Sequence, residues 1–128
     1  MSKKALIITD GTDSIENVAK SISEELDDFK VKVCSADKFE GTDLLSADIF
    51  FIGCERPSHP SFSYLEKMLA HINLAARKCG VFTVKEKTLD YLCGIVNACE
   101  AKSGAPLLVV SKIINKPALK KWINGIVK

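Results

Sequence analysis

The sequence has little net charge and no long hydrophobic run. Its 18 lysines and arginines nearly balance 16 aspartates and glutamates, which leaves a net charge of +2 over 128 residues. We expect no nucleic-acid partner, because proteins that bind nucleic acids gather their cations on one face or stripe. No apolar window approaches the ~20 residues that a membrane span requires. No secretory signal pattern is found in the first residues, so we expect neither membrane insertion nor secretion.

The cysteines lack the spacing of a redox or metal motif. There are five of them, an odd number, and none forms a C-x-x-C pair. This pattern supports neither a disulfide framework nor a zinc site nor a dithiol redox centre. Free and mostly buried thiols suit a reducing compartment, so we expect a cytoplasmic protein. The five are Cys34, Cys54, Cys79, Cys93 and Cys99.

Catalytic groups are scarce as well. The chain holds two histidines, His59 and His71. No Ser-His-Asp set, metal cluster or pair of buried carboxylates can be assembled around them. We therefore predict no catalytic residues and no metal ligands, and we expect an electron carrier or a binding module rather than an enzyme.

The sequence does contain a regular alternation of strand and helix patterns. With 47% hydrophobic and 27% charged residues, it has the composition of one globular domain spanning residues 1–128. The strand candidates are short continuous apolar runs, which are typical of parallel strands covered on both faces. They are Ala5–Thr9, Val31–Ser35, Ile49–Gly53, Val81–Val84 and Leu107–Ser111.

Between the strands, apolar residues recur at the spacing of helices with one buried face. These faces are Ile15, Val18, Ala19, Ile22 and Leu26; Phe62, Leu65, Met68, Leu69 and Ile72; Leu89, Leu92, Cys93, Val96 and Cys99; and Leu119, Trp122, Ile123 and Ile126. Ser14 is a candidate N-cap for the first helix, Ser61 stands at the start of the second, and Pro117 can open the last. The order of elements predicts an α/β three-layer sandwich with right-handed crossovers.

A ligand site in such a fold has a predictable place. In doubly wound sheets, ligands bind outside the carboxyl ends of the strands, at the point where the strand order reverses. For five strands in the order 2-1-3-4-5, that point lies between the first and third strands. We therefore expect the site in three loops, over residues 10–14, 54–60 and 85–90.

Four segments of the chain resemble a short-chain flavodoxin. They are "KALIITDGTDSIENVAKSISEEL" at the first strand and helix, "ADIFFIGC" at the third strand, "RKCGVF" at the fourth and "LLVVSKIINKP" at the fifth. The resemblance covers nearly the full length and implies a flavodoxin-like fold with a five-stranded parallel sheet. Flavodoxins hold FMN non-covalently and pass single electrons. The resemblance therefore also implies FMN as the cofactor, electron transfer as the function and a redox protein as a partner.

The opening loop departs from the flavodoxin phosphate pattern T/S-x-T-G-x-T. When the pattern is aligned on the helix start "ENVA", its first two hydroxyl residues correspond to Asp10 and Thr12. Its glycine corresponds to Asp13, and its last hydroxyl residue corresponds to Ile15. Only the second of these agrees with the pattern. A register shifted by one residue recovers hydroxyls and uses Thr9, Gly11, Thr12 and Ser14.

Two carboxylates, Asp10 and Asp13, approach the phosphate in either register. At ~5 Å and an effective dielectric constant near ~20, each unit-charge pair costs about 3 kcal/mol before solvent relaxation. A helix N-terminus stabilises a nearby anion by only about 1 kcal/mol. We therefore expect FMN to bind weakly or not at all. The alternative interpretation of Asp13 is that it stabilises the start of its own helix.

The second loop, "CERPSHPSFSY", lies where flavodoxins place one side chain against the flavin ring. Its candidates are Cys54, Glu55, Arg56 and His59. An arginine or histidine here could stack on a flavin or hold an anionic ligand, although His59 also fits an ordinary surface loop. A cation beside Cys54 would lower the pKa of the thiol. The alternative is that Cys54, at the end of a buried strand, is a small apolar residue.

The third loop, "TVKEKTLDYL", has no glycine. The resemblance implies bare backbone along the flavin edge here, whereas Lys85, Glu86 and Lys87 carry long side chains. Tyr91 is the one aromatic candidate for stacking on a ring, and its helical spacing from Leu92 fits packing equally well.

Two functions follow from this sequence. We favour a flavodoxin-like domain that binds FMN weakly or not at all and serves as a binding module for a partner or small ligand, as a monomer or weak homodimer. The alternative is a functional FMN-binding flavodoxin that carries single electrons. A response-regulator receiver ranks last, because Gly53 or Cys54 stands where its phosphorylated aspartate would close the third strand. The candidate cofactor-binding residues are Asp10, Gly11, Thr12, Asp13, Ser14, Ile15, Cys54, Glu55, Arg56, His59, Lys85 and Tyr91.

Overall fold

A parallel β-sheet forms the centre of the computed structural model, which describes residues 3–74, 77–103, 106–109 and 114–127. The sheet order is β2-β1-β3-β4-β5, with β6 also paired to β4, and every pair is parallel. The predicted order 2-1-3-4-5 is therefore confirmed. The strands are β1 Lys3–Thr9, β2 Phe29–Ser35, β3 Ile49–Gly53, β4 Lys78–Thr83, β5 Lys102–Ser103 and β6 Leu107–Leu108.

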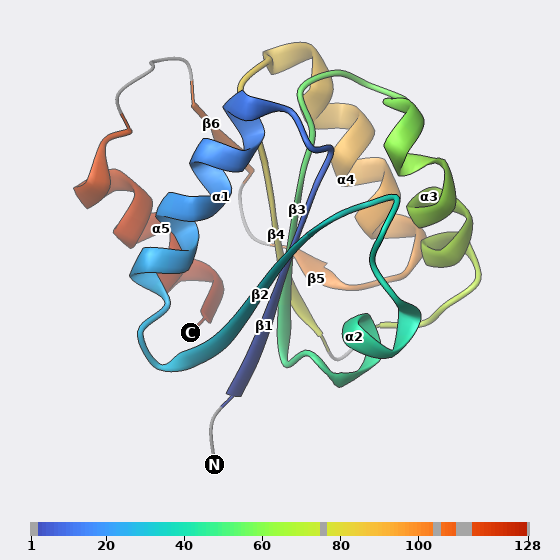
Figure 1. The fold of residues 1–128 in the computed structure, drawn as a ribbon, viewed down its shortest axis with the longest axis horizontal. Coiled ribbons are helices and arrows are strands. Elements are labelled where there is room, and N and C mark those ends of the chain that lie inside the picture. Colours follow the sequence, from blue (N-terminus) through green and yellow to red (C-terminus); the bar gives the residue numbers. More distant parts are fainter. Residues whose placement is uncertain (1–2, 75–76, 104–105, 110–113, 128) are drawn as a thin grey trace.

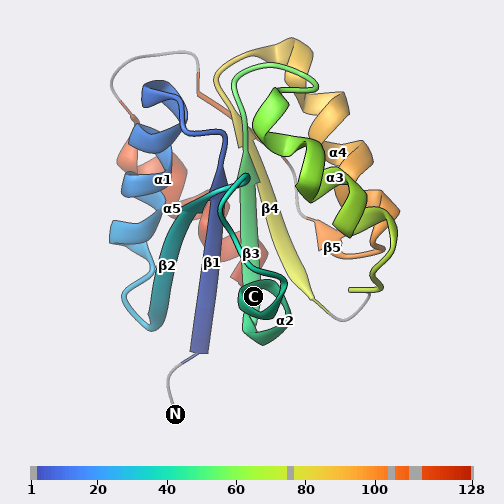
Figure 2. The same ribbon diagram turned by 45° about the vertical axis from the view of Figure 1, so that its right-hand side comes forward.

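Helices cover both faces of the sheet (Figures 1 and 2). On one face lie α1 Asp13–Glu25 and α5 Lys116–Val127. On the other lie α2 Gly41–Ser46, α3 Ser63–Ala70 and α4 Leu89–Ala98. Short 3₁₀ turns, η1 Pro60–Phe62 and η2 Glu86–Thr88, lead into α3 and α4. The three layers are those predicted from the alternation of strands and helices.

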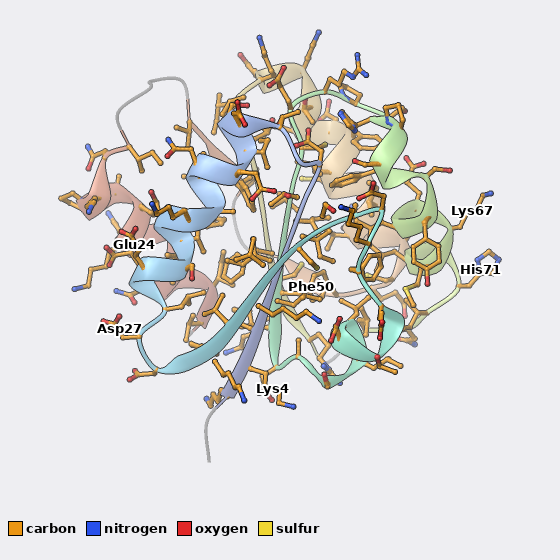
Figure 3. The ribbon with its side chains drawn as sticks, in the orientation of Figure 1. Lys4, Glu24, Asp27, Phe50, Lys67 and His71 are labelled. Carbon is orange, nitrogen blue, oxygen red and sulfur yellow. The ribbon has the colours of Figure 1, made fainter. Side chains whose placement is uncertain are left out.

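The sheet separates two hydrophobic cores. In β3, Ile49 and Phe51 pack towards α1 and α5, whereas Phe50 and Ile52 pack towards α3 and α4. Figure 3 shows Phe50 in the interior, with charged side chains such as Lys4 at the periphery. Both sides of the strand are buried, so an uninterrupted apolar run is what its position requires. Except for Leu89, which is half-buried and belongs to neither core, the residues of the predicted helix faces pack into these two cores.

The sheet boundaries differ from the prediction at the amino ends of three strands. β1, β2 and β4 begin earlier than predicted, at Lys3, Phe29 and Lys78, because these residues still pair with the neighbouring strand. Lys78 also donates from Nζ to the backbone carbonyl of Val127 at 2.8 Å, which gives its charged end a partner beyond the sheet. At the other end, β4 stops at Thr83 and does not include Val84.

The predicted strand Leu107–Ser111 is described only in part. β6 is confined to Leu107–Leu108, and the following Val109 donates its backbone N–H to the carbonyl of Thr83 at 2.9 Å. Ser111 lies outside the described residues. The short β5, which the sequence did not predict, pairs with the start of β4. Two short strands therefore occupy the fifth position of the sheet.

The helix ends differ from the predicted caps. Thr12, not Ser14, is the N-cap of α1, because Thr12 still has an extended backbone whereas Ser14 already lies inside the helix. His59, not Ser61, caps the turn that leads into α3. Pro117 lies in the first turn of α5 as predicted, where its missing N–H breaks no helical hydrogen bond.

The packing of α5 on the sheet depends on a glycine in β4. A Cβ at Gly80 would lie 2.7 Å from Ile126, 2.8 Å from Phe51 and 2.9 Å from Trp122, closer than side-chain carbons approach one another. Glycine therefore allows the helix to lie close against β4. Of the helices that the structure describes, none is both long and apolar enough for a membrane crossing.

Candidate functional site

Three loops meet at the carboxyl edge of the sheet. β1, β3 and β4 are neighbours and end at Thr9, Gly53 and Thr83. The loops that follow them lie together at the top of Figure 1, where the chain enters α1, η1 and η2. We call the residues 9–14, 54–61 and 83–88 the strand-end loops. They include two of the three segments in which the sequence placed the site, residues 10–14 and 54–60, and overlap the third, residues 85–90, as far as residue 88.

Asp10 is the buried acid of the strand-end loops. The residue is 5% exposed, and both of its carboxylate oxygens accept hydrogen bonds. Oδ1 accepts from the backbone N–H of Thr12 at 3.0 Å and from the Thr12 hydroxyl at 2.6 Å. Oδ2 accepts from the backbone N–H of Glu55 at 2.7 Å. These three donors offset the cost of burying a charge, and they join the first loop to the second.

Each hydroxyl of the first strand-end loop donates to a carboxylate of the same chain. The pairs are Thr9 with Glu16, Thr12 with Asp10 and Ser14 with Glu55, at 2.7, 2.6 and 2.8 Å between the oxygens. A hydroxyl has a single proton to donate. While these pairs persist, none of the three hydroxyls can also donate to the phosphate of a ligand.

The other candidates of the first loop have different roles. Gly11 has a backbone φ of +82°, which favours glycine, and its N–H donates to the Thr9 hydroxyl oxygen at 3.2 Å. Asp13 is exposed in the first turn of α1, where a carboxylate stabilises the helix N-terminus. Ile15 is fully buried in the core, so its side chain cannot reach a ligand at the edge. Besides Asp10, the carboxylates hydrogen-bonded to this loop come from Glu16 and Glu55, not from Asp13.

Two buried threonines join the third strand-end loop to the second, and the sequence analysis missed both. The Thr83 hydroxyl donates to the carbonyl of Cys54 at 2.7 Å and accepts from the backbone N–H of Lys85 at 3.2 Å. The Thr88 hydroxyl donates to the carbonyl of Glu55 at 2.9 Å. Thr83 had a signal in the sequence, since a threonine that closes an apolar strand places a hydroxyl at its carboxyl end.

The expectation that a neighbouring cation lowers the pKa of the Cys54 thiol is contradicted by the structure. The residue is fully buried in the core under α3 and α4. Burial, and next to it the charge of Asp10, raise the pKa of the Cys54 thiol to about 12. Arg56 is exposed and does not lower this pKa. Cys54 is therefore the small apolar residue of the alternative interpretation.

The histidine and lysine candidates contribute to the loop structure. His59 is half-buried, and its Nδ1 accepts from the backbone N–H of Ser61 at 3.2 Å and lies 2.8 Å from the Ser61 hydroxyl. That nitrogen is a cap for the turn η1 rather than a free base. Lys85 has an exposed side chain. Its backbone N–H donates to the Thr83 hydroxyl, and its carbonyl accepts from the backbone N–H of Thr88 at 3.0 Å.

Tyr91 packs in the core instead of standing free at the edge. It is half-buried on α4, and its ring centroid lies 6.4 Å from that of Phe62 at an interplanar angle of 43°. Burial, and after it the neighbouring Glu66 carboxylate, raise the pKa of the phenol. Tyr91 Oη is buried and has no hydrogen bond of ordinary geometry to the described residues. The packing interpretation therefore fits this side chain.

The described residues contain no group of three or more His, Cys, Asp or Glu side chains placed to hold a metal ion. Within the strand-end loops, the polar groups described above form hydrogen bonds with one another. Carboxylates accept from hydroxyls and amides, and threonine hydroxyls donate to carbonyls.

Comparison with known proteins identifies the fold. No protein-family model matches the chain, and the search of curated proteins found no match. Among solved structures, a short-chain flavodoxin associated with a PDU bacterial microcompartment aligns with a TM-score of 0.83 and 18% identity, over 99% of this chain and 97% of that one. The Streptococcus pneumoniae TIGR4 flavodoxin aligns at 0.79 and 17%, over 98% of each chain. Oxidised Flavodoxin 2 from Bacillus cereus aligns at 0.76 and 17%, over 97% of each chain. The chain therefore has a flavodoxin-like fold.

Proposed function

We propose that this chain is a cytoplasmic, single-domain binding module with a flavodoxin-like fold that does not hold FMN as a resident cofactor. It binds a protein partner or a small ligand at the strand-end loops. The observation that carries the proposal is the pairing of all three hydroxyls of the first loop with carboxylates. These hydroxyls are the groups that the phosphate pattern would use.

The residues at the edge do not fit the FMN phosphate. A phosphate at the start of α1 would need donors that Asp10 already occupies, including the backbone N–H of Thr12. It would also approach the carboxylates of Asp10 and Glu55, and each unit-charge pair costs about 3 kcal/mol at ~5 Å. The third loop, with the exposed side chains of Lys85 and Lys87, lacks the bare backbone that a flavin edge requires.

A second candidate function is FMN-dependent electron transfer with a redox protein as the partner. It is favoured by the likeness of the whole fold to three flavodoxins at TM-scores of 0.76–0.83. The two functions differ in one property that is easily measured. An electron carrier binds FMN tightly, whereas the proposed module does not.

The test is a flavin titration of the purified protein. We expect colourless protein and no quenching of FMN fluorescence up to about 100 µM, which limits the binding free energy to roughly −5.5 kcal/mol or weaker. Riboflavin is titrated in parallel, because it carries the ring without the phosphate. A flavodoxin of similar size serves as the positive control.

Yellow protein, or FMN quenching that saturates at micromolar concentration, would refute the proposal and establish the second candidate. Riboflavin binding without FMN binding would locate the obstacle at the phosphate, as the carboxylate pairing predicts. Because the module is proposed to act by contact, we expect it to work as a monomer or weak homodimer without chemistry of its own.

A further inference from the structure

Glu55 is held from three sides by three different elements. Its backbone N–H donates to Asp10 Oδ2 at 2.7 Å, from the loop after β1. Its backbone carbonyl accepts from the Thr88 hydroxyl at 2.9 Å, at the end of η2. Its carboxylate accepts from the Ser14 hydroxyl at 2.8 Å, in the first turn of α1. Each hydrogen-bonding group of this one residue is therefore held by another part of the chain.

Two further residues of the second loop, Cys54 and Ser61, also connect it to the other two loops. The carbonyl of Cys54 accepts from the Thr83 hydroxyl, which is fully buried. At the far end of the second loop, the Ser61 hydroxyl lies 3.5 Å from the carbonyl of Asp10. The second loop is thus fixed to the first and third loops at both of its ends, while Arg56, Pro57 and Ser58 between them are exposed.

These contacts have the properties of a cooperative unit. They join groups 29 to 51 residues apart in the sequence, and they share their partners. Asp10, for example, holds the amides of Thr12 and Glu55 with one carboxylate. When a shared group loses one partner, the others lose their orientation as well, so the bonds of such a network depend on one another.

We propose that Glu55 is a positioning residue that couples the three strand-end loops into one preformed body, so that a change in any loop is transmitted to the other two. The coupling concerns the protein without any ligand, so it does not depend on the function proposed above.

The test is amide hydrogen exchange by NMR on the free protein, with the variant Thr88→Val. This change removes one hydroxyl from the third loop and keeps the shape of the side chain. We expect the protection of the Glu55 and Thr12 amides to fall ten-fold or more, although Thr88 contacts neither amide directly. The control is Ser46→Ala, which removes an exposed hydroxyl bond of α2 and should leave both amides unchanged.

The reverse variant is Ser14→Ala, which also keeps the test valid should Thr88→Val fail to fold. It removes the bond to the Glu55 carboxylate, and we expect faster exchange of the Thr88 amide, which donates to the carbonyl of Lys85 at 3.0 Å. Exchange that rises only in the mutated loop, in either variant, would overturn the coupling. Because no ligand is present, that result would leave the flavin titration and its conclusion unaffected.

Discussion

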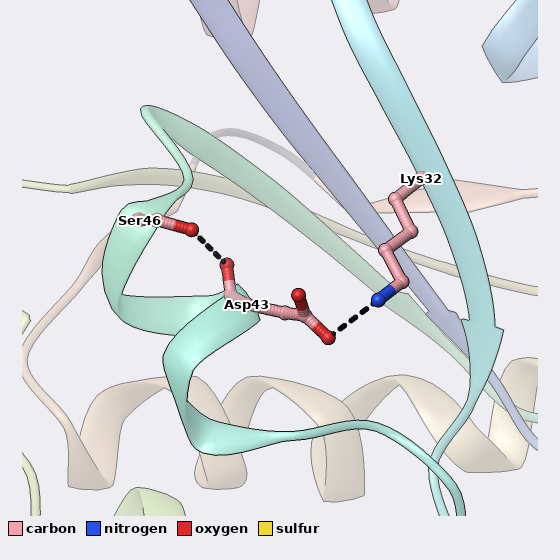
Figure 4. A network of polar contacts seen from close by, with 3 residues as sticks. All are labelled: Lys32, Asp43 and Ser46. Carbon is pink, nitrogen blue, oxygen red and sulfur yellow. Dashed lines mark hydrogen bonds and ion pairs between the residues drawn. The ribbon is translucent and has the colours of Figure 1, made fainter.

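Two polar networks of this protein have hydrogen bonds of similar length and very different surroundings. At the strand-end loops, Asp10 and Thr83 are buried, and each forms a 2.7 Å hydrogen bond to a backbone group in another loop. On the opposite part of the sheet, Lys32 of β2 pairs with Asp43 of α2 at 2.7 Å, and Ser46 donates to the Asp43 carbonyl at 3.2 Å (Figure 4). The Lys32 side chain there is 59% exposed.

Burial rather than distance decides what such bonds contribute. An exposed group that loses its partner regains water, so a surface ion pair contributes little to stability. A buried donor or acceptor that loses its partner keeps the cost of its desolvation. We therefore expect large effects from small changes at the strand-end loops and small effects from complete removal of the surface network.

The largest difference between the two regions is expected in thiol chemistry. Burial raises the pKa of the Cys54 thiol to about 12. For Cys34 on β2, burial raises the pKa and the nearby Lys32 partly opposes it, with a result of about 11. Near pH 8 the thiolate fraction of Cys54 should therefore lie far below that of an ordinary cysteine, and Cys54 is also fully buried whereas Cys34 is half-buried.

Alkylation of the native protein followed by peptide mapping measures this order. We expect Cys34 to be labelled before Cys54, and urea-unfolded protein to label both equally. Cys54 labelled first would mean that the second strand-end loop opens readily, which would remove the contrast between the two regions.

The next largest effect is expected from Asp10→Asn. The asparagine keeps an oxygen that accepts from Thr12, but its amide N–H faces the backbone N–H of Glu55. The Glu55 N–H therefore loses its acceptor, and the network loses the negative charge of Asp10. We expect the free energy of unfolding to fall by about 3 kcal/mol, the upper range for a buried polar group left without a partner. Urea denaturation measures the loss.

The matched control is Asp13→Asn, which removes an exposed carboxylate three residues away in the same loop. Its loss should stay near 0.5 kcal/mol, the size of a favourable charge at a helix N-terminus. Equal losses for the two variants would contradict the role assigned to Asp10.

A smaller loss is expected from Thr83→Val. The change removes the hydroxyl that lies between the Cys54 carbonyl and the Lys85 N–H while keeping the buried shape. We expect a loss of about 1 to 2 kcal/mol, because the Cys54 carbonyl remains buried without its donor. Thr42→Val, at an exposed position of α2, is the control and should be close to neutral. A neutral Thr83→Val would show that water or another group replaces the hydroxyl.

The sequence was sufficient to predict the layers and the sheet order, because burial on both faces leaves a local pattern. Ile49, Phe50, Phe51 and Ile52 alternate between the two cores, and only a strand covered on both sides requires such a run. The apolar faces of the helices carry the same kind of local information. The edges of strands were less predictable, since Lys78 looks polar in the sequence and still pairs within the sheet.

The partners within the site could not be predicted in the same way. Asp10 was recognised as a misplaced charge for a phosphate loop, but its bond to Glu55 joins residues 45 positions apart. Nothing local in the sequence indicates that the amide of Glu55, rather than its charge, would meet Asp10. Thr88 was missed for the same reason, because its acceptor is a backbone carbonyl 33 residues away, and every residue has such a carbonyl.

The smallest effect is expected from Lys32→Met, which removes the surface ion pair and keeps the aliphatic stem. The hydrogen bond from Lys32 lowers the pKa of Asp43, and the bond to Asp43 raises the pKa of Lys32. The stability that the pair contributes is therefore lost as pH falls through the lowered carboxyl pKa, and again as pH rises through the raised amine pKa. Between these limits we expect urea midpoints of wild type and variant to differ by little more than their scatter, and less in 1 M salt. If Lys32→Met instead destabilised the protein as much as Thr83→Val, exposure to solvent would not determine how much a hydrogen bond contributes to stability here. The difference between the two networks would then have to lie in their geometry.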